Sequence, residues 1–216
     1  MRETIYTIPI NEAFEAAAEH GDGCAVCALR KGLEGQKTEY IMGAAMMEPD
    51  VRERTNALGF CRRHLAAMLA MRNRLSLSLM LQTHIDTLRA HPEKRLAPGQ
   101  SCFVCESVQT LLDKYYSNML YMWGSSADFR ALCAKAPPVC MRCASGLWEA
   151  AGRLPKKQAS AVRAELSRRA RERLDALYAD ISLFCKSFDH RFAGMELGDA
   201  ATAAERSADF LQGEAP

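Results

Sequence analysis

Pairs of metal-ligand side chains recur along this chain, and the two members of each pair are always three residues apart. Three of the pairs are Cys-x-x-Cys, and the fourth is Cys61-x-x-His64. Two residues at this spacing, placed at the start of a helix or on a tight turn, can direct both side chains at one point. Tetrahedral zinc takes four such thiolate or imidazole ligands at about 2.0–2.3 Å. The chain therefore carries ligands for two metal ions, which we predict to be zinc.

The four pairs belong to two copies of one unit. A shift of 78 residues places the first Cys-x-x-Cys pair on the second and aligns Asp50-Val51-Arg52 with Asp128-Phe129-Arg130. After one inserted residue, the pair Cys61/His64 meets the pair Cys140/Cys143. Chance matching of cysteines would not also align an Asp-apolar-Arg triplet. The pattern therefore indicates an internal duplication.

If each copy closes its own site, the ligands divide into one Cys₃His set and one Cys₄ set. The predicted sets are Cys24, Cys27, Cys61 and His64 in the first copy, and Cys102, Cys105, Cys140 and Cys143 in the second. His and Cys are the two residues that zinc sites exchange most freely, so the single difference between the copies supports metal binding. Four protein ligands leave no open coordination position, so we predict structural sites and assign no catalytic residue.

Two other uses of these cysteines stay open. An iron–sulfur cluster suits a Cys₄ set, although the histidine of the other set makes it less favoured than zinc. Thiol redox chemistry also uses Cys-x-x-Cys, but that motif usually follows a strand in a βαβ unit, and none is predicted here. Cys133 and Cys185 fall outside the repeat and are predicted to be small core residues.

Helices must position these pairs, because no stretch shows the alternation typical of a strand. The clearest helix is predicted over 155–188, where apolar residues recur every three or four positions from Val162 to Phe188. Other helices are predicted from an N-cap at Asn11 to Gly21, over 28–46, from Pro49, over 65–88, over 107–122 and over 128–133. The predicted fold is all-α: a helical bundle of two duplicated units, each closed by a metal site, plus a long C-terminal helix.

The repeat also suggests how the chain is divided. We predict a first metal-binding helical repeat over 1–91, a linker over 92–101 and a second repeat over 102–153. The linker is polar and bracketed by prolines. The long helix and tail, 154–216, are expected to pack on both repeats as one globular unit.

Several charged residues are candidates for roles around the metals or in binding. Arg52 and Arg130 recur at equivalent places, where each could bond a carboxylate or backbone carbonyls. We favour a position beside the thiolates, whose charge reaches about −2 for zinc with four cysteines. Asp189, His190 and Arg191 end the long helix as a cluster that suits either a helix C-terminus or a binding site. The run Arg163 to Arg173 forms a basic face that acidic residues interrupt.

Net charge and hydropathy give little support to several classes of protein. The formal net charge of +2 is too small to indicate nucleic acid or membrane by itself. No segment reaches the roughly 18 apolar residues that a membrane span requires, and the first residues lack the apolar core of a signal peptide. We therefore predict a cytoplasmic protein, in which thiols stay reduced and clustered cysteines bind metal before they form disulfides.

Several motifs resemble those of an uncharacterised bacterial family, common in Firmicutes and carried as a domain of unknown function. They are the opening Glu3-Thr4-Ile5-Tyr6-Thr7-Ile8-Pro9-Ile10-Asn11-Glu12-Ala13-Phe14, Cys24-x-x-Cys27, Met47 to Arg52, Gly59-Phe60-Cys61-Arg62-Arg63-His64 and Phe188-Asp189-His190-Arg191-Phe192. The last of these has His190 where the family has Tyr. The resemblance implies a cytoplasmic bacterial protein and brings no established activity.

The leading hypothesis is a non-enzymatic, zinc-stabilised helical protein that binds an unknown protein or small molecule and no membrane. An enzyme or redox protein that uses the cysteines, or the Asp189-His190-Arg191 cluster, is the alternative. Nucleic-acid binding through the Arg163–Arg173 face ranks last, because the net charge is near neutral.

Overall fold

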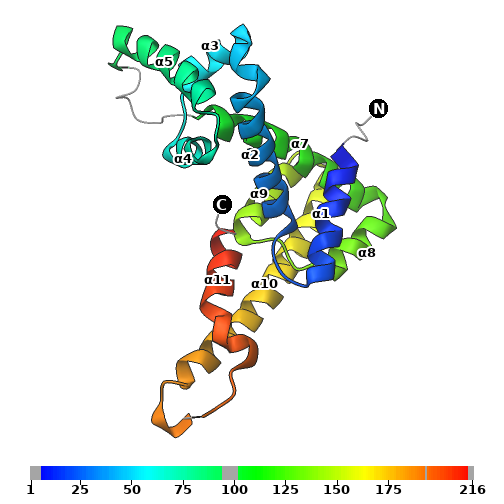
Figure 1. Cartoon of the computed structure of the whole chain (residues 1–216). Helices are drawn as coiled ribbons and strands as arrows, with labels where there is room; N and C mark the ends of the chain where they lie inside the picture. Colours follow the sequence, from blue (N-terminus) through cyan, green and yellow to red (C-terminus); the bar gives the residue numbers. More distant parts are fainter. Residues whose placement is uncertain (1–5, 94–101, 193, 214–216) are drawn as a thin grey trace. The chain divides into compact units, whose positions relative to one another are not determined.

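A computed structural model of the chain describes residues 6–93, 102–192 and 194–213, and these residues form helices and connecting turns without strands. Figure 1 shows the helices in chain order. They are α1 (Thr7–His20), α2 (Ala25–Met42), η2 (Ala44–Met47), α3 (Pro49–Leu58), α4 (Arg62–Ala70), α5 (Arg74–Ala90), α7 (Phe103–Ser125), α8 (Ala127–Lys135), α9 (Met141–Ala151), α10 (Lys156–Lys186), η3 (His190–Phe192), η4 (Gly198–Thr202) and α11 (Ala203–Gln212). The all-α prediction is confirmed. None of the described helices is both long and apolar enough to cross a bilayer.

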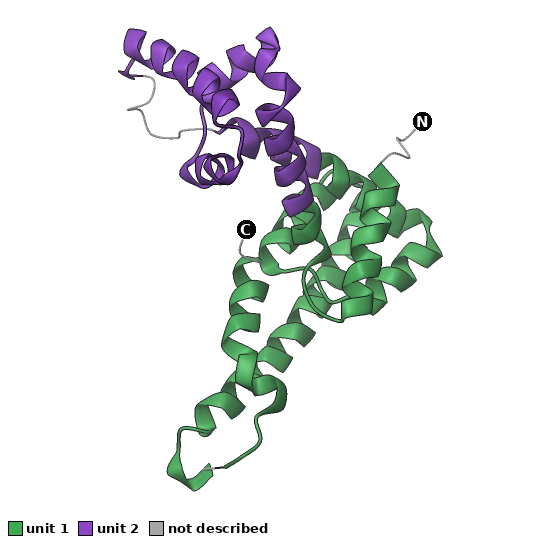
Figure 2. Ribbon diagram, in the orientation of Figure 1, with its two compact units in different colours: residues 1–29, 113–216 green, residues 30–112 purple. Residues whose placement is uncertain are grey.

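The chain forms two compact units, which Figure 2 colours separately. Unit 1 contains residues 1–29 and 113–216, and unit 2 contains residues 30–112. This division follows packing and differs from the division by sequence repeat, because each unit takes helices from both copies. The predicted linker over 92–101 falls for the most part outside the described residues.

Unit 1 is built around α10, the longest helix. Helix α10 packs on α9 and α11, and α1 packs on α8. Phe14 of α1 and Phe129 of α8 meet edge to face, with ring centroids 5.3 Å apart. Helix α9 lies close to α7, because a Cβ at Gly146 would stand 2.7 Å from the Tyr116 ring. Only glycine allows that approach.

Unit 2 packs α3 on α5, with η2 beside both helices. Its core is aliphatic and sulfur-rich, with Ile41, Met68 and Met80 almost fully buried. The buried His84 directs its Nδ1 at the carbonyl of Asn56, 2.9 Å away, and so ties α5 to α3. The amide of Phe103 donates to the carbonyl of Gly59 over 3.0 Å, which brings the start of α7 to the segment before α4.

Two helix predictions need correction. The helix predicted over 65–88 is two helices, α4 and α5, because Asn73 begins a new one. Its side chain accepts from the Ser76 amide at 3.2 Å and donates to the Met42 carbonyl at 2.9 Å, a capping arrangement that favours a break in the helix. Helix α1 begins at Thr7, before the predicted N-cap Asn11, since Pro9 is tolerated within the first turn of a helix. The long helix predicted over 155–188 is present as α10, and the shorter α11 follows it.

Candidate metal centres

Four cysteines of unit 1 converge on one point. Their sulfur atoms all lie within 4.8 Å of one another, and the four residues are Cys24, Cys27, Cys140 and Cys143. All four are buried. We call this group site A. It joins the start of α2 to the start of α9, which are more than a hundred residues apart in the sequence.

The second group lies in unit 2 and contains the histidine. Its members are Cys61, His64, Cys102 and Cys105, whose ligand atoms again lie within 4.8 Å of one another. His64 is buried, Cys61 is half-buried and Cys105 is exposed. We call this group site B. It joins the start of α4 to the start of α7 and reaches solvent more readily than site A.

The eight predicted ligands are thus the residues of both groups, but the predicted pairing within each copy is wrong. Each group takes one pair from the first copy and one from the second. The first pair of each copy joins the second pair of the other copy. One group is Cys₄ and the other Cys₃His, as predicted, although each set has different members. All four pairs have the same spacing and the same local setting, so either pairing satisfies the local geometry. The packing of the helices selects between them.

Each pair occupies the same place on its helix. The first residue lies immediately before the helix and the second is the third residue within it, as in Cys61 and His64 on α4 or Cys140 and Cys143 on α9. In every case the carbonyl of the first residue accepts the first helical hydrogen bond, at 2.8–3.0 Å. Two helix N-termini therefore point at each group. Their positive ends favour thiolate charge.

The distances within the groups match the edges of a zinc tetrahedron. Zinc–sulfur bonds of about 2.3 Å give sulfur–sulfur edges of roughly 3.8 Å, and a nitrogen ligand shortens its edges to roughly 3.6 Å. In site A, the sulfur of Cys27 lies 3.6 Å from that of Cys140 and 3.7 Å from that of Cys143. In site B, the edge between the sulfurs of Cys61 and Cys105 is 3.9 Å. These separations far exceed a disulfide bond of about 2.05 Å.

The nitrogen ligand of site B is Nδ1 of His64. That atom lies 3.3 Å from the sulfur of Cys61 and 3.4 Å from the sulfurs of Cys102 and Cys105. The other ring nitrogen, Nε2, faces Glu34, whose carboxylate lies 4.0 Å away. Arg63 donates to both oxygens of that carboxylate, at 2.8 and 3.0 Å, and so fixes its position. Arg63 Nη2 also lies 3.4 Å from Nε2. At 4.0 Å the carboxylate of Glu34 makes no hydrogen bond to Nε2, but it lies on the side of the ring from which a carboxylate can orient a metal-bound histidine.

The titration of these groups also suits a cation. Burial, followed by the charge of Arg63, lowers the pKa of His64, so the ring is neutral and free to coordinate. Burial and the neighbouring Cys102 raise the pKa of Cys105 to about 12. In site A, a hydrogen bond from Cys143 lowers the pKa of Cys140, and the same bond raises the pKa of Cys143. One thiol of this pair therefore ionises at the expense of the other, and a divalent cation would allow both to ionise.

An arginine accompanies each group, at equivalent positions of the two copies. Burial opposes the charge of Arg63, but Glu34 and then the thiol of Cys105 raise its pKa above the usual value. Arg142 holds the corresponding place in site A. Its Cδ lies 3.8 Å from the position of a Cβ on Gly213, which itself meets the sulfurs of Cys27 and Cys140 at 3.2 and 3.3 Å. The end of α11 thus covers site A.

The arginines that the sequence favoured for this role have other partners. Arg52 donates to the carbonyl of Met46 at 3.3 Å, and Arg130 donates to that of Trp123 at 2.8 Å. Within the described residues neither makes a hydrogen bond or ion pair with a ligand cysteine. The two do share one function, because each bonds a carbonyl of the segment that precedes its own helix. The carbonyl-bonding alternative therefore describes Arg52 and Arg130, and the arginine that interacts with a ligand cysteine is Arg63.

The polar cluster after α10 is a local arrangement. Asp189 forms an ion pair with Arg191 and also accepts from its backbone amide at 3.0 Å. The side chain of His190 is 94% exposed. These bonds stabilise the turn after the helix, in keeping with the helix-terminus interpretation.

The basic face of α10 is largely engaged within the protein. Arg168 pairs with Glu165 and Glu172, and Arg169 donates to the carbonyls of Cys133 and Ala136. Arg163 donates to the carbonyl of Trp148 at 3.2 Å and stacks on its ring.

The two cysteines outside the metal groups differ in burial. Cys133 is half-buried, whereas Cys185 is exposed, so the predicted core position of Cys185 is wrong.

Comparison with known proteins gives one match. A model described as "Family of unknown function (DUF6062)" matches residues 1–100 and 93–216, which together cover the chain. No curated protein and no solved structure matches.

Proposed function

The chain belongs to the family of unknown function DUF6062, and we propose that it is a zinc-stabilised helical binding protein with two structural zinc ions. Site A holds one zinc through four cysteines, and site B holds the other through three cysteines and Nδ1 of His64. The observation that carries the proposal is the set of ligand separations, 3.3–3.9 Å, which fit zinc tetrahedra in both groups.

The ligand sets argue for structural rather than catalytic metals. Catalytic zinc keeps one position for water or substrate, whereas each group here offers four protein ligands. Each zinc would join helices that are distant in the sequence, which is the role of a structural ion. A bacterial cytoplasm, where thiols stay reduced, suits eight such ligands. The protein then acts by binding a protein or small molecule, without chemistry at the metals.

Metal analysis tests the proposal. Protein purified without chelator is expected to contain two zinc per chain. The Cys105→Ala variant should keep one, because site B then lacks a ligand. The matched control is Cys185→Ala, an exposed cysteine outside both groups, which should keep two. Folded protein without metal would refute the proposal, and iron with sulfide and visible absorbance would replace it with the iron–sulfur alternative.

A further inference from the structure

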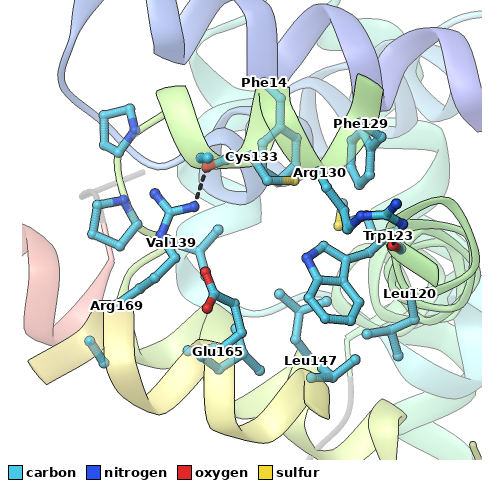
Figure 3. Close-up of a pocket in the computed structure, with 18 residues that line it drawn as sticks. Phe14, Leu120, Trp123, Phe129, Arg130, Cys133, Val139, Leu147, Glu165 and Arg169 are labelled. Carbon is cyan, nitrogen blue, oxygen red and sulfur yellow. Dashed lines mark hydrogen bonds between the residues drawn. The ribbon is translucent and has the colours of Figure 1, made fainter. Parts of the chain in front are cut away.

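An apolar pocket lies in unit 1 against one face of α10. It has a volume of about 90 Å³ and is walled by α1, α7, α8, α9, α10 and the segment 137–139. Its aromatic and aliphatic walls include Phe14, Trp123, Phe129, Leu147 and Val162. Figure 3 shows the Trp123 ring extending into the space between these walls. We call this space the α10 pocket.

The size and walls of the α10 pocket suit one ring. An apolar cavity of about 150 Å³ in another protein stays dry and binds benzene. The α10 pocket is smaller, about 90 Å³, but it is partly open, so a single small ring can enter it with one edge toward solvent. Water gains little here, since it needs two to four polar partners. An apolar group that fills the space instead gains contacts with every wall.

The charged residues at the pocket already have partners. The guanidinium of Arg169 donates to the carbonyls of Cys133 and Ala136 at the end of α8, and one of these bonds is drawn in Figure 3. The carboxylate of Glu165 accepts from Arg168. Burial raises the pKa of Cys133 to about 12, so its thiol is neutral. Arg169 and Glu165 each already bond within the protein, which favours an uncharged ligand over one that must compete with those bonds.

One donor at the pocket is free for a ligand. Within the described part of the chain, the indole N–H of Trp123 makes no hydrogen bond to the protein, although its backbone carbonyl accepts from Arg130. Trp123 is half-buried and solvent reaches its indole N–H, which a ring that fills the pocket would cover. An indole N–H usually finds a partner when it is removed from water. A ligand acceptor at the Trp123 edge of the pocket would provide one.

From these features we propose that the α10 pocket binds an uncharged single-ring molecule that offers one hydrogen-bond acceptor to Trp123. The proposal rests on the binding role proposed above and names the chemical class of its ligand. Site A supports one wall, because Val139 precedes Cys140 directly and Ala144 and Leu147 lie on the helix that begins there. Zinc at site A and a ring in the pocket should therefore stabilise each other.

The two tryptophans make the test direct. Benzyl alcohol, a ring with one hydroxyl, is titrated into zinc-loaded full-length protein while the two indole N–H resonances are followed by NMR. We expect a saturable shift of the Trp123 resonance, with a dissociation constant on the order of 1 mM for so small a ligand. The Trp148 resonance, assigned through Trp148→Phe, should move far less. Benzoate and benzylammonium should bind more weakly than the alcohol.

A matched pair of variants on α8 locates the site. Ala134 is exposed and lines the pocket, and Ala131 is exposed without lining it. Ala134→Leu should weaken binding about tenfold or more, and Ala131→Leu should leave it unchanged. A linear response, equal shifts of both tryptophans or equal effects of the two variants would overturn the proposal. Zinc is counted in the same samples, so two zinc per chain without ligand binding refutes only the pocket.

Discussion

Two double variants distinguish the ligand pairing of the structure from pairing within each copy. Cys24→Ala with Cys140→Ala removes two ligands of site A alone, so one zinc per chain should remain at site B. Cys24→Ala with Cys61→Ala damages both sites, so no zinc should remain. Pairing within each copy predicts the opposite result for both variants.

The cost of losing each site follows from the loop that it closes. Site A links Cys27 to Cys140, which are 113 residues apart, and site B links Cys61 to Cys105, which are 44 apart. Treated as cross-links that restrict the unfolded chain, they contribute about 4.8 and 4.0 kcal/mol. The Cys24→Ala/Cys140→Ala variant should therefore lose about 1 kcal/mol more free energy of unfolding than Cys61→Ala/Cys102→Ala. Pairing within each copy would close two loops of nearly equal length.

Native mass spectrometry gives zinc per chain directly, and urea unfolding of zinc-loaded protein gives the difference in free energy. Far-ultraviolet circular dichroism checks that each variant stays helical, and Cys185→Ala again serves as control. Retention of one zinc by Cys24→Ala/Cys61→Ala, with none in Cys24→Ala/Cys140→Ala, would refute the pairing seen in the structure.

Three further predictions concern residues around the sites. Gly213→Val should speed zinc extraction from site A by a chelator, because φ of +86° strongly favours glycine and a Cβ would press on two sulfurs; an unchanged rate would show that α11 does not cover the site. Glu34→Gln should lower the zinc affinity of site B about 10–100-fold in a competition titration and leave site A unaffected, whereas equal loss at both sites would contradict its role beside His64. Asn73→Ala should cost about 1 kcal/mol in urea unfolding through loss of the N-cap of α5, and no change would refute the capping role.

The helical fold follows from local signals that the sequence carries. The apolar stripe from Val162 to Phe188 predicts α10 to within two residues at each end, because burial of one face depends on spacing alone. The break between α4 and α5 at Asn73 has no clear signal in the sequence. Apolar residues continue across that position, and only its bonds to the Ser76 amide and the Met42 carbonyl reveal the cap.

The residues around the metal groups were harder to foresee. Glu34 lies in a helix with nothing in its neighbourhood to connect it to His64, thirty residues later. The sequence does mark Arg63, because an arginine recurs at the equivalent position of the second copy, Arg142. Each lies between the two ligands of the later pair of its copy. Nothing in the sequence marks Gly213, because its contact with Cys27 and Cys140 depends on how α11 packs back along α10.

By itself, the sequence determined the eight candidate ligands and their placement in pairs at helix starts, because a three-residue spacing is a local property of the chain. Which pairs meet was decided by the tertiary structure. Four pairs with the same spacing and helix position satisfy a tetrahedron in either combination, so local geometry cannot choose between them. The choice depends on which helix N-termini the core brings together: those of α2 and α9 at Cys27 and Cys140, and those of α4 and α7 at Cys61 and Cys105.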